Sequence, residues 1–131
     1  MNRIAITALV AIHFVASIWH GNAHTTLAVG LSPAQTAFVY IVIVLAPLVA
    51  AGVMWTRYQT VGVWLFFASM LGAFLFGAYN HYVLVSPDNI AHLPPGSPEA
   101  HAQFIDSAAT IAWIELGAAL YGAYSLGRAA R

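Results

Sequence analysis

The sequence predicts an all-α integral membrane protein in which four transmembrane helices form one bundle. Of the 131 residues, 61% are hydrophobic and only 6% are charged, whereas about a quarter of the residues in a soluble domain are charged. The hydrophobic residues also gather into four long segments. Because about 20 apolar residues are needed to cross a hydrocarbon layer about 30 Å thick, each segment is long enough, or nearly so, to span a membrane.

The four apolar segments cover residues 4–20, 34–55, 61–80 and 104–127, and the predicted outer loops are 21–32 and 81–103. This spacing leaves no room for a separate soluble domain, so residues 1–131 are predicted to form a single membrane domain. A β-barrel is disfavoured, because its strands alternate apolar and polar residues over about 10 positions.

The first segment, residues 4–20, allows a second interpretation as part of a secretory signal peptide. Its apolar core is followed by small residues at 21–23, which is the order found in cleaved signals. Cleavage there would leave His24 at the new N-terminus, where its amine and ring can chelate copper together. His13 interrupts the apolar core, and we therefore favour a helix that stays in the membrane.

The second segment has a clear start and an irregular middle. Ser32 precedes Pro33, and Gln35 lies three residues after Ser32. This arrangement caps the free backbone N–H groups at a helix start. Pro47 falls within the span and removes one backbone hydrogen bond, so we expect a kink there.

The chain between the third and fourth segments is too broken for one long helix, because residues 86–98 contain four Pro and one Gly. Ser97 and Pro98 then signal a new helix start, with Glu99 in the first turn, where the helix dipole favours an acidic residue. The fourth helix is thus expected to begin before residue 104, which places His101 on a helix.

The arginines set the predicted orientation. With four spans, all four fall on one side of the membrane: Arg3, Arg57, Arg128 and Arg131. The positive-inside rule makes this side cytoplasmic. Both termini are then predicted to be cytoplasmic, in a multi-pass protein of a bacterial inner membrane or another cytoplasmic membrane. Membrane lipid, which surrounds the bundle, is the first expected partner.

The histidines gather on the opposite, extracytoplasmic side. Five of the six lie at or beyond the outer surface, together with three acidic residues: His20, His24, His81, His92, His101, Asp88, Glu99 and Asp106. If the outer segments pack together, imidazoles and carboxylates form a cluster where four helix ends meet.

A metal site is predicted within this cluster. His20 and His24 are four residues apart, so a continuous helix places them on one face, one turn apart. His81 stands at a comparable level at the end of the third span. Neutral imidazole and carboxylate suit Zn²⁺, Cu²⁺ or non-haem iron. The full set of expected ligands is His20, His24, His81, His101, Asp88 and His92.

A b-type haem is the alternative cofactor. It would be held between two spans by one His from each, here His20 or His24 with His81. Gly77, on the third span, would leave room for the edge of the macrocycle.

Two ionisable residues are predicted inside the bilayer. Glu115 lies about 11 residues into the fourth span, where an isolated carboxylate costs several kcal/mol or stays protonated. His13 is the other ionisable group at intermediate depth. We expect a His13–Glu115 pair that faces the bundle interior and acts as a proton relay, with the alternative that it is a packing hydrogen bond.

These residues support three hypotheses. The first is a metal- or haem-binding membrane protein with a redox or metal-handling role; as an oxidoreductase it would receive quinone from the lipid, and the pair of His13 and Glu115 would move the proton. The second is a small proton- or cation-coupled transporter that uses Glu115 and works as a homo-oligomer. The third is a non-catalytic accessory subunit of a larger membrane complex.

Several function classes are excluded by composition. The net charge is zero and the chain has no Lys, which argues against a nucleic-acid partner, because phosphates require clustered basic residues. The absence of Cys rules out thiolate metal sites and thiol nucleophiles.

Overall fold

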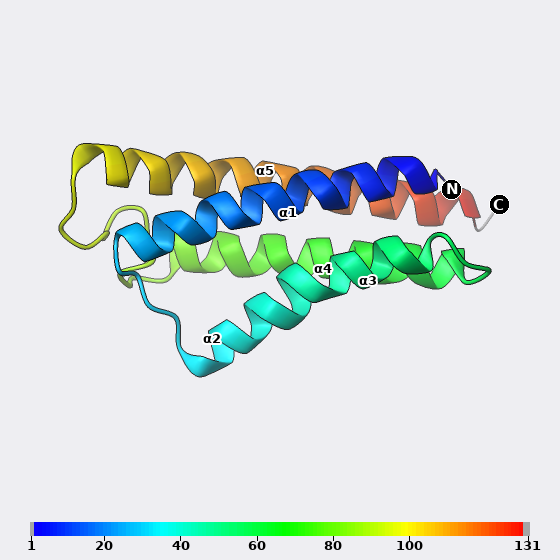
Figure 1. Cartoon of the computed structure of the whole chain (residues 1–131), viewed down its shortest axis with the longest axis horizontal. Helices are drawn as coiled ribbons and strands as arrows, with labels where there is room; N and C mark the ends of the chain where they lie inside the picture. Colours follow the sequence, from blue (N-terminus) through cyan, green and yellow to red (C-terminus); the bar gives the residue numbers. More distant parts are fainter. Residues whose placement is uncertain (1, 130–131) are drawn as a thin grey trace.

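The computed structural model describes residues 2–129, which form helices joined by turns and loops (Figure 1). In chain order the helices are α1 (Arg3–Thr26), α2 (Pro33–Phe38), the π-helix η1 (Val39–Leu45), α3 (Ala46–Val53), α4 (Gln59–Ala78), the π-helix η2 (Tyr79–Val83) and α5 (Pro98–Ala129). The segments α2–η1–α3 and α4–η2 are each continuous, so these helices form four long spans. All four are long and apolar enough to cross a membrane, which confirms the predicted all-helical, four-span architecture.

The helix starts follow the predicted capping signals. The N–H of Gln35 donates to the Ser32 hydroxyl, and the Gln35 side chain accepts from the backbone N–H of Ser32, so the two residues form a capping box at the start of α2. At the start of α5, the N–H of Ala100 donates to the Ser97 hydroxyl. These bonds satisfy N–H groups that have no partner within the helix.

The second span changes its helical register at the predicted kink. Residues Val39–Leu45 form a π-helix, in which the N–H of Ala46 bonds to the carbonyl of Ile41, five residues back. Pro47 follows directly; it has no N–H, and its ring crowds the carbonyl of Ile43 in a regular α-helix. At the kink the helix therefore changes from π-helical to α-helical hydrogen bonding, and α2 leans away from α1 (Figure 1).

The other spans pack closely. The main hydrophobic core joins α1, α3, α4 and α5 and contains Ile6, Val10, Ala50, Met54, Val63, Phe66, Met70, Ala118 and Ala119. Gly122 lets α5 approach α4, because a Cβ on it would lie 3.0 Å from the Cβ of Phe67. A second, smaller core of Ala23, Leu27, Val29, Ala100 and Phe104 closes the other end.

The two ends of the bundle differ in their charged groups. We call the end that contains Arg3, Arg57 and Arg128 the arginine end, and the end that contains His20, His24 and His81 the histidine end. The Arg3 guanidinium lies over the Trp55 ring, 4.6 Å from its centroid, and the start of α1 and the end of α5 both lie at the arginine end (Figure 1). Between the two ends the outer surface is apolar; Trp113, for example, is 74% exposed.

Candidate metal centre

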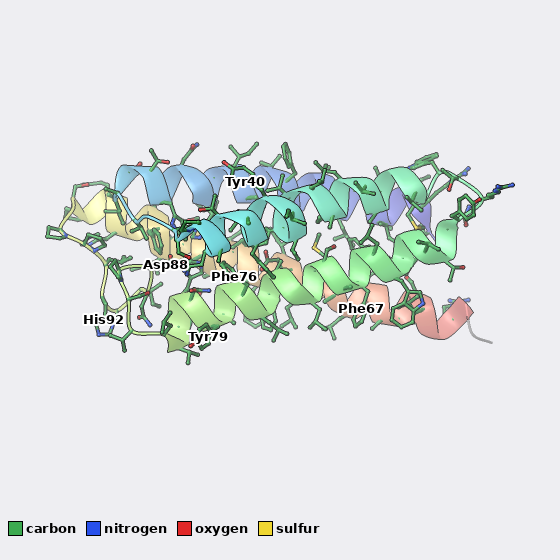
Figure 2. All side chains as sticks on the ribbon, turned by 90° about the horizontal axis from the view of Figure 1, so that it is seen from below. Tyr40, Phe67, Phe76, Tyr79, Asp88 and His92 are labelled. Carbon is green, nitrogen blue, oxygen red and sulfur yellow. The ribbon has the colours of Figure 1, made fainter. Side chains whose placement is uncertain are left out.

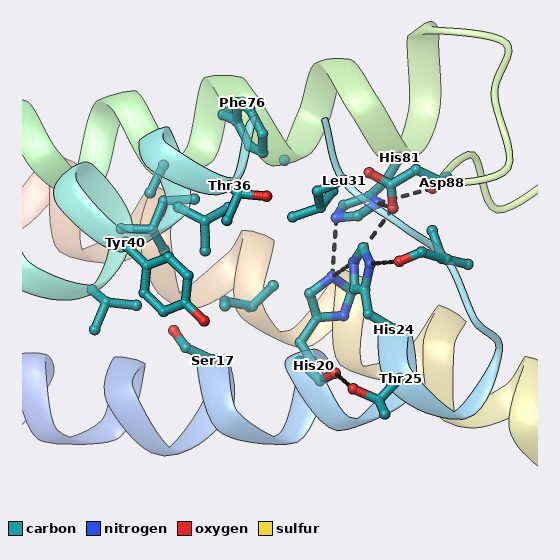
Figure 3. Close-up of a pocket in the computed structure, with 18 of the residues that line it drawn as sticks. Ser17, His20, His24, Thr25, Leu31, Thr36, Tyr40, Phe76, His81 and Asp88 are labelled. Carbon is teal, nitrogen blue, oxygen red and sulfur yellow. Dashed lines mark hydrogen bonds and ion pairs between the residues drawn. The ribbon is translucent and has the colours of Figure 1, made fainter. Parts of the chain in front are cut away.

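Three imidazoles converge at the histidine end, two from α1 and one from η2 (Figure 3). The Nε2 atom of His20 lies 3.1 Å from Nε2 of His81 and 3.1 Å from Nε2 of His24. One ligand nitrogen from each residue lies within 4.8 Å of the other two. These three residues can hold a metal ion.

Local helix geometry positions the three rings. Because α1 continues unbroken to Thr26, His20 and His24 lie one turn apart on the same face. His81 lies in η2, the wider helical segment that ends α4. The Asn80 side chain steadies this segment: its amide donates to the Phe76 carbonyl, and its oxygen accepts from Gln35 of α2.

The hydrogen bonds on the far side of the rings determine the tautomers of His24 and His81. The Nδ1 atom of His24 lies 3.3 Å from the carbonyl oxygen of Val29, and Nδ1 of His81 lies 3.0 Å from the carbonyl oxygen of Asp88. A carbonyl oxygen only accepts, so Nδ1 carries the proton in both rings. In the neutral rings, Nε2 then presents a lone pair to the centre of the cluster; Oδ1 of Asp88 lies 3.4 Å from Nε2 of His24 but forms no hydrogen bond with it.

His20 has the same tautomer for a less direct reason. Its Nδ1 lies 2.9 Å from the Ser107 hydroxyl oxygen. That hydroxyl donates its own proton to the Phe104 carbonyl, 3.1 Å away, and therefore accepts from His20. The Nε2 atom of His20 is thus also a lone-pair donor that faces the other two.

The Nε2 atom of His20 lies 3.1 Å from Nε2 of each of the other two rings, and nitrogen lone pairs at this distance repel one another unless a cation lies between them. Zn–N bonds are about 2.0–2.1 Å long, which separates neighbouring nitrogens of a tetrahedral site by about 3.3 Å. The two 3.1 Å contacts at His20 are close to this separation. The cluster therefore has the donor atoms, the tautomers and the spacing of a metal site.

Asp88 adds a negative charge beside the cluster. Its Oδ1 lies 3.1 Å from Nδ1 of His81 and 3.4 Å from Nε2 of His24. Both carboxylate oxygens are buried without a hydrogen-bond donor. Burial raises the pKa of Asp88, but the side-chain contact with His81, followed by the nearby rings of His24 and His20, holds this pKa below its ordinary value. The carboxylate is thus suited to balance a cation held by the imidazoles.

Two of the predicted ligands lie apart from this group. His92 is exposed on the loop at the end of the molecule, whereas Asp88 points inward (Figure 2). The Nδ1 atom of His92 lies 3.4 Å from the side-chain oxygen of Asn89. His101 donates through Nε2 to the Pro94 carbonyl, 2.8 Å away, and so braces the loop before α5.

The two ionisable residues predicted inside the bilayer lie next to each other. The Nε2 atom of His13 lies 3.1 Å from Oε1 of Glu115, and both side chains are almost fully buried between α1 and α5. Along α1, His13 precedes His20 by two turns, so the pair lies deeper in the bundle than the three converging imidazoles.

A cavity of about 590 Å³ connects the two groups. Its polar lining residues are Ser17, His20, His24, Thr25, Thr36, Tyr40, His81, Asp88 and Glu115. The remaining wall is largely apolar and includes Val39, Ile43, Phe76 and Ile111. The cavity lies on the side where α2 and η1 separate from α1, with Tyr40 and Ser17 on one side of it and the three imidazoles on the other (Figure 3).

Sequence reasoning did not identify Ser107, the hydroxyl that orients His20. Ser107, Ile111 and Glu115 follow one another at four-residue steps and form one row on α5. A second polar residue on the row of Glu115 is a signal that could have indicated Ser107. The cavity itself could not be found this way, because it arises from the register change in the second span.

Comparison of the chain with models of known protein families, with curated proteins and with solved structures finds no match.

Proposed function

We propose that this chain is an integral membrane protein that binds a divalent transition metal ion through His20, His24 and His81, in a redox or metal-handling role. The observation that carries the proposal is the convergence of three Nε2 lone pairs, each directed inward by a hydrogen bond on the opposite side of its ring. In metal sites such outer hydrogen bonds fix the ring orientation and raise the basicity of the ligand.

The donor set favours a single ion over a haem. Three imidazole nitrogens suit Zn²⁺, Cu²⁺ or Fe²⁺. A haem needs its two axial nitrogens on opposite faces of a planar ring. His20 and His81 are only 3.1 Å apart, and His24 lies beside them at the same distance from His20, so a macrocycle between them would displace all three rings.

The location of the site follows from the charge distribution. Three arginines at one end and the imidazoles at the other support an orientation with the arginine end in the cytoplasm. The metal centre then lies at the extracytoplasmic face. Deeper in the bundle, the pair of His13 and Glu115 is suited to exchange a proton with a molecule in the cavity.

Metal analysis of the purified protein tests the proposal. The chain is expressed in medium replete with zinc, copper, iron and haem, extracted in detergent, and analysed for bound elements and for a Soret band. We expect about one metal ion per chain, because one set of three nitrogens is present. Stoichiometric haem, or the absence of both metal and haem, would overturn the proposal.

Single variants localise the ion. His20→Ala, His24→Ala and His81→Ala each remove one nitrogen, and we expect each to lose most of the bound metal. His92→Ala is the matched control, because it removes an exposed imidazole at the same end of the bundle. Equal metal loss from the control and the ligand variants would show that the ion is bound elsewhere.

A further inference from the structure

The cavity beside the metal centre has the composition of a ligand site. It is about 590 Å³ in volume, within the range of about 300–1,000 Å³ that holds small organic ligands. The three imidazoles and Glu115 line part of it, and the rest of its wall is largely apolar. A ligand that fills it therefore needs a polar head and an apolar body.

Gly77 keeps the polar part of the cavity continuous. A Cβ at this position would lie 3.8 Å from Oε2 of Glu115 and 3.8 Å from Cδ2 of His81. The lack of a side chain on α4 thus leaves space between the carboxyl group and the nearest imidazole. One small polar head can contact both.

The free coordination position of the metal ion and the free acceptor oxygen of Glu115 define the polar head of the ligand. Oδ1 of Asp88 lies against the outer nitrogen of His81, Nδ1, at 3.1 Å, so the three Nε2 atoms are the protein ligands and leave the fourth position of a tetrahedral ion free for an exogenous ligand. Glu115 uses Oε1 for His13, which leaves Oε2 on the side of Gly77 as an acceptor. A hydroxyl group matches both requirements, because its oxygen is a metal ligand and its proton is a hydrogen-bond donor.

The route into the cavity is lateral. Its wall includes α2 and η1, which lean away from α1 (Figure 1), and Tyr40 on this wall is 66% exposed. In a membrane this face of the second span contacts lipid. The aromatic rings of Tyr40 and Phe76 on the wall favour a planar ring as the body next to the head.

We propose that the cavity binds a lipid-soluble hydroxylated aromatic molecule, of the hydroquinone or phenol class, that enters from the bilayer. This inference rests on the proposed metal site. The hydroxyl group lies between the three imidazoles and Glu115 and donates its hydrogen bond to Oε2 of Glu115. The ring lies against η1 and α4, and an alkyl tail extends between α1 and the second span into the lipid.

Binding of a hydroquinone with a ten-carbon tail tests the inference. Zinc-loaded protein in detergent is titrated with the hydroquinone and, separately, with the alkylbenzene that has the same tail and no hydroxyl groups, by isothermal titration calorimetry. We expect saturable binding of the hydroquinone and binding at least about tenfold weaker for the alkylbenzene, because an acceptor is left without its donor. Equal affinities, or no saturable hydroquinone binding, would overturn the inference.

Filling the cavity provides the structural control. Gly77→Val adds methyl groups between Glu115 and His81 and is expected to weaken hydroquinone binding at least about tenfold. Gly117→Val makes the same change on α5 at a position with open space around it and should bind like the wild type. Val39→Phe fills the cavity from η1, away from the metal ligands. If Gly77→Val fails to fold, weaker hydroquinone binding by Val39→Phe supports the inference, and unchanged binding contradicts it.

The metal content of each variant separates this inference from the proposed function. Wild-type protein that binds none of zinc, copper and iron contradicts the metal site itself. Zinc-loaded Gly77→Val or Val39→Phe with unchanged hydroquinone affinity contradicts only the assignment of the cavity.

Discussion

Each imidazole of the candidate metal centre is held by one hydrogen bond on the side that faces away from the cluster. The acceptors are two backbone carbonyls, of Val29 and Asp88, and the hydroxyl of Ser107. These bonds determine which nitrogen carries the proton, so they determine whether the rings present lone pairs or N–H groups to an ion. At the scale of single residues, the binding chemistry thus depends as much on the acceptors as on the histidines.

Ser107→Ala tests the role of the side-chain acceptor. Without the hydroxyl, Nδ1 of His20 loses its partner and the ring loses its fixed tautomer, so we expect metal affinity to fall about 10–100-fold. Competition with a chelator of known affinity measures the change. Ser125→Ala removes another buried hydroxyl of α5 at the arginine end and should leave the affinity unchanged. Equal loss in both variants would contradict the prediction.

The buried pair of His13 and Glu115 is expected to contribute to the stability of the fold. Glu115→Leu leaves the buried Nε2 of His13 without a partner, and we expect a loss of about 1–3 kcal/mol in the free energy of unfolding. The double variant His13→Leu, Glu115→Leu should recover much of this loss, because no polar group stays unpaired. Reversible unfolding in SDS measures both changes. A double variant less stable than Glu115→Leu would contradict this account.

Residue type and spacing account for part of the site. His20 and His24 could be paired from their four-residue spacing, and His81 could be placed at the same level from the order of the spans. Asp88 could be placed at the same end but not at its distance from His81, because the backbone of residues 84–97 has no periodic pattern. The residue type of Ser107 does not indicate a role in the site, since most Ser side chains in apolar helices bond to their own backbone; only its place on the same row of α5 as Glu115 does.

The second span is the element that creates the cavity. Its π-helical turns lie directly before Pro47, and the outer part of the span leans away from α1 while α3 stays packed in the main core. A kink at Pro47 could be predicted, because a proline lacks the N–H that an α-helix needs. The direction of the lean could not, because it depends on the hydrogen bond from Gln35 to Asn80 and on the stacking of Phe38 on Phe76 of α4.

Pro47→Ala tests the link between helix register and cavity. Alanine restores an N–H and favours the α-helix, so we expect η1 to shorten and α2 to move toward α1. The chain has no Cys, so spin labels can be attached at Ile18→Cys and Ala37→Cys, and the distance between them should decrease. A label pair on α1 and α5, at Ile12→Cys and Trp113→Cys, is the control. An unchanged first distance would show that Pro47 does not set the lean.

The whole molecule is polar at its two ends and apolar between them, and the two ends carry opposite chemistry. The arginine end holds basic side chains and aromatic rings, with Arg3 over Trp55 and Arg57 beside Tyr58. The histidine end holds imidazoles and the buried Asp88 carboxylate. Composition predicts a membrane protein, and the four long apolar segments predict its four spans. Its arrangement around a lateral cavity depends on tertiary contacts that composition does not encode.

The orientation of the molecule gives the last prediction. Basic residues near span ends favour the cytoplasmic side, so the arginine end should face the cytoplasm. Ala91→Cys lies on an exposed loop of the histidine end and Thr56→Cys on an exposed turn of the arginine end. In intact spheroplasts, a membrane-impermeant maleimide should label Ala91→Cys at once and Thr56→Cys only after the membrane is permeabilised. The reverse pattern would place the metal centre in the cytoplasm, where the metal would come from cytoplasmic rather than external supply.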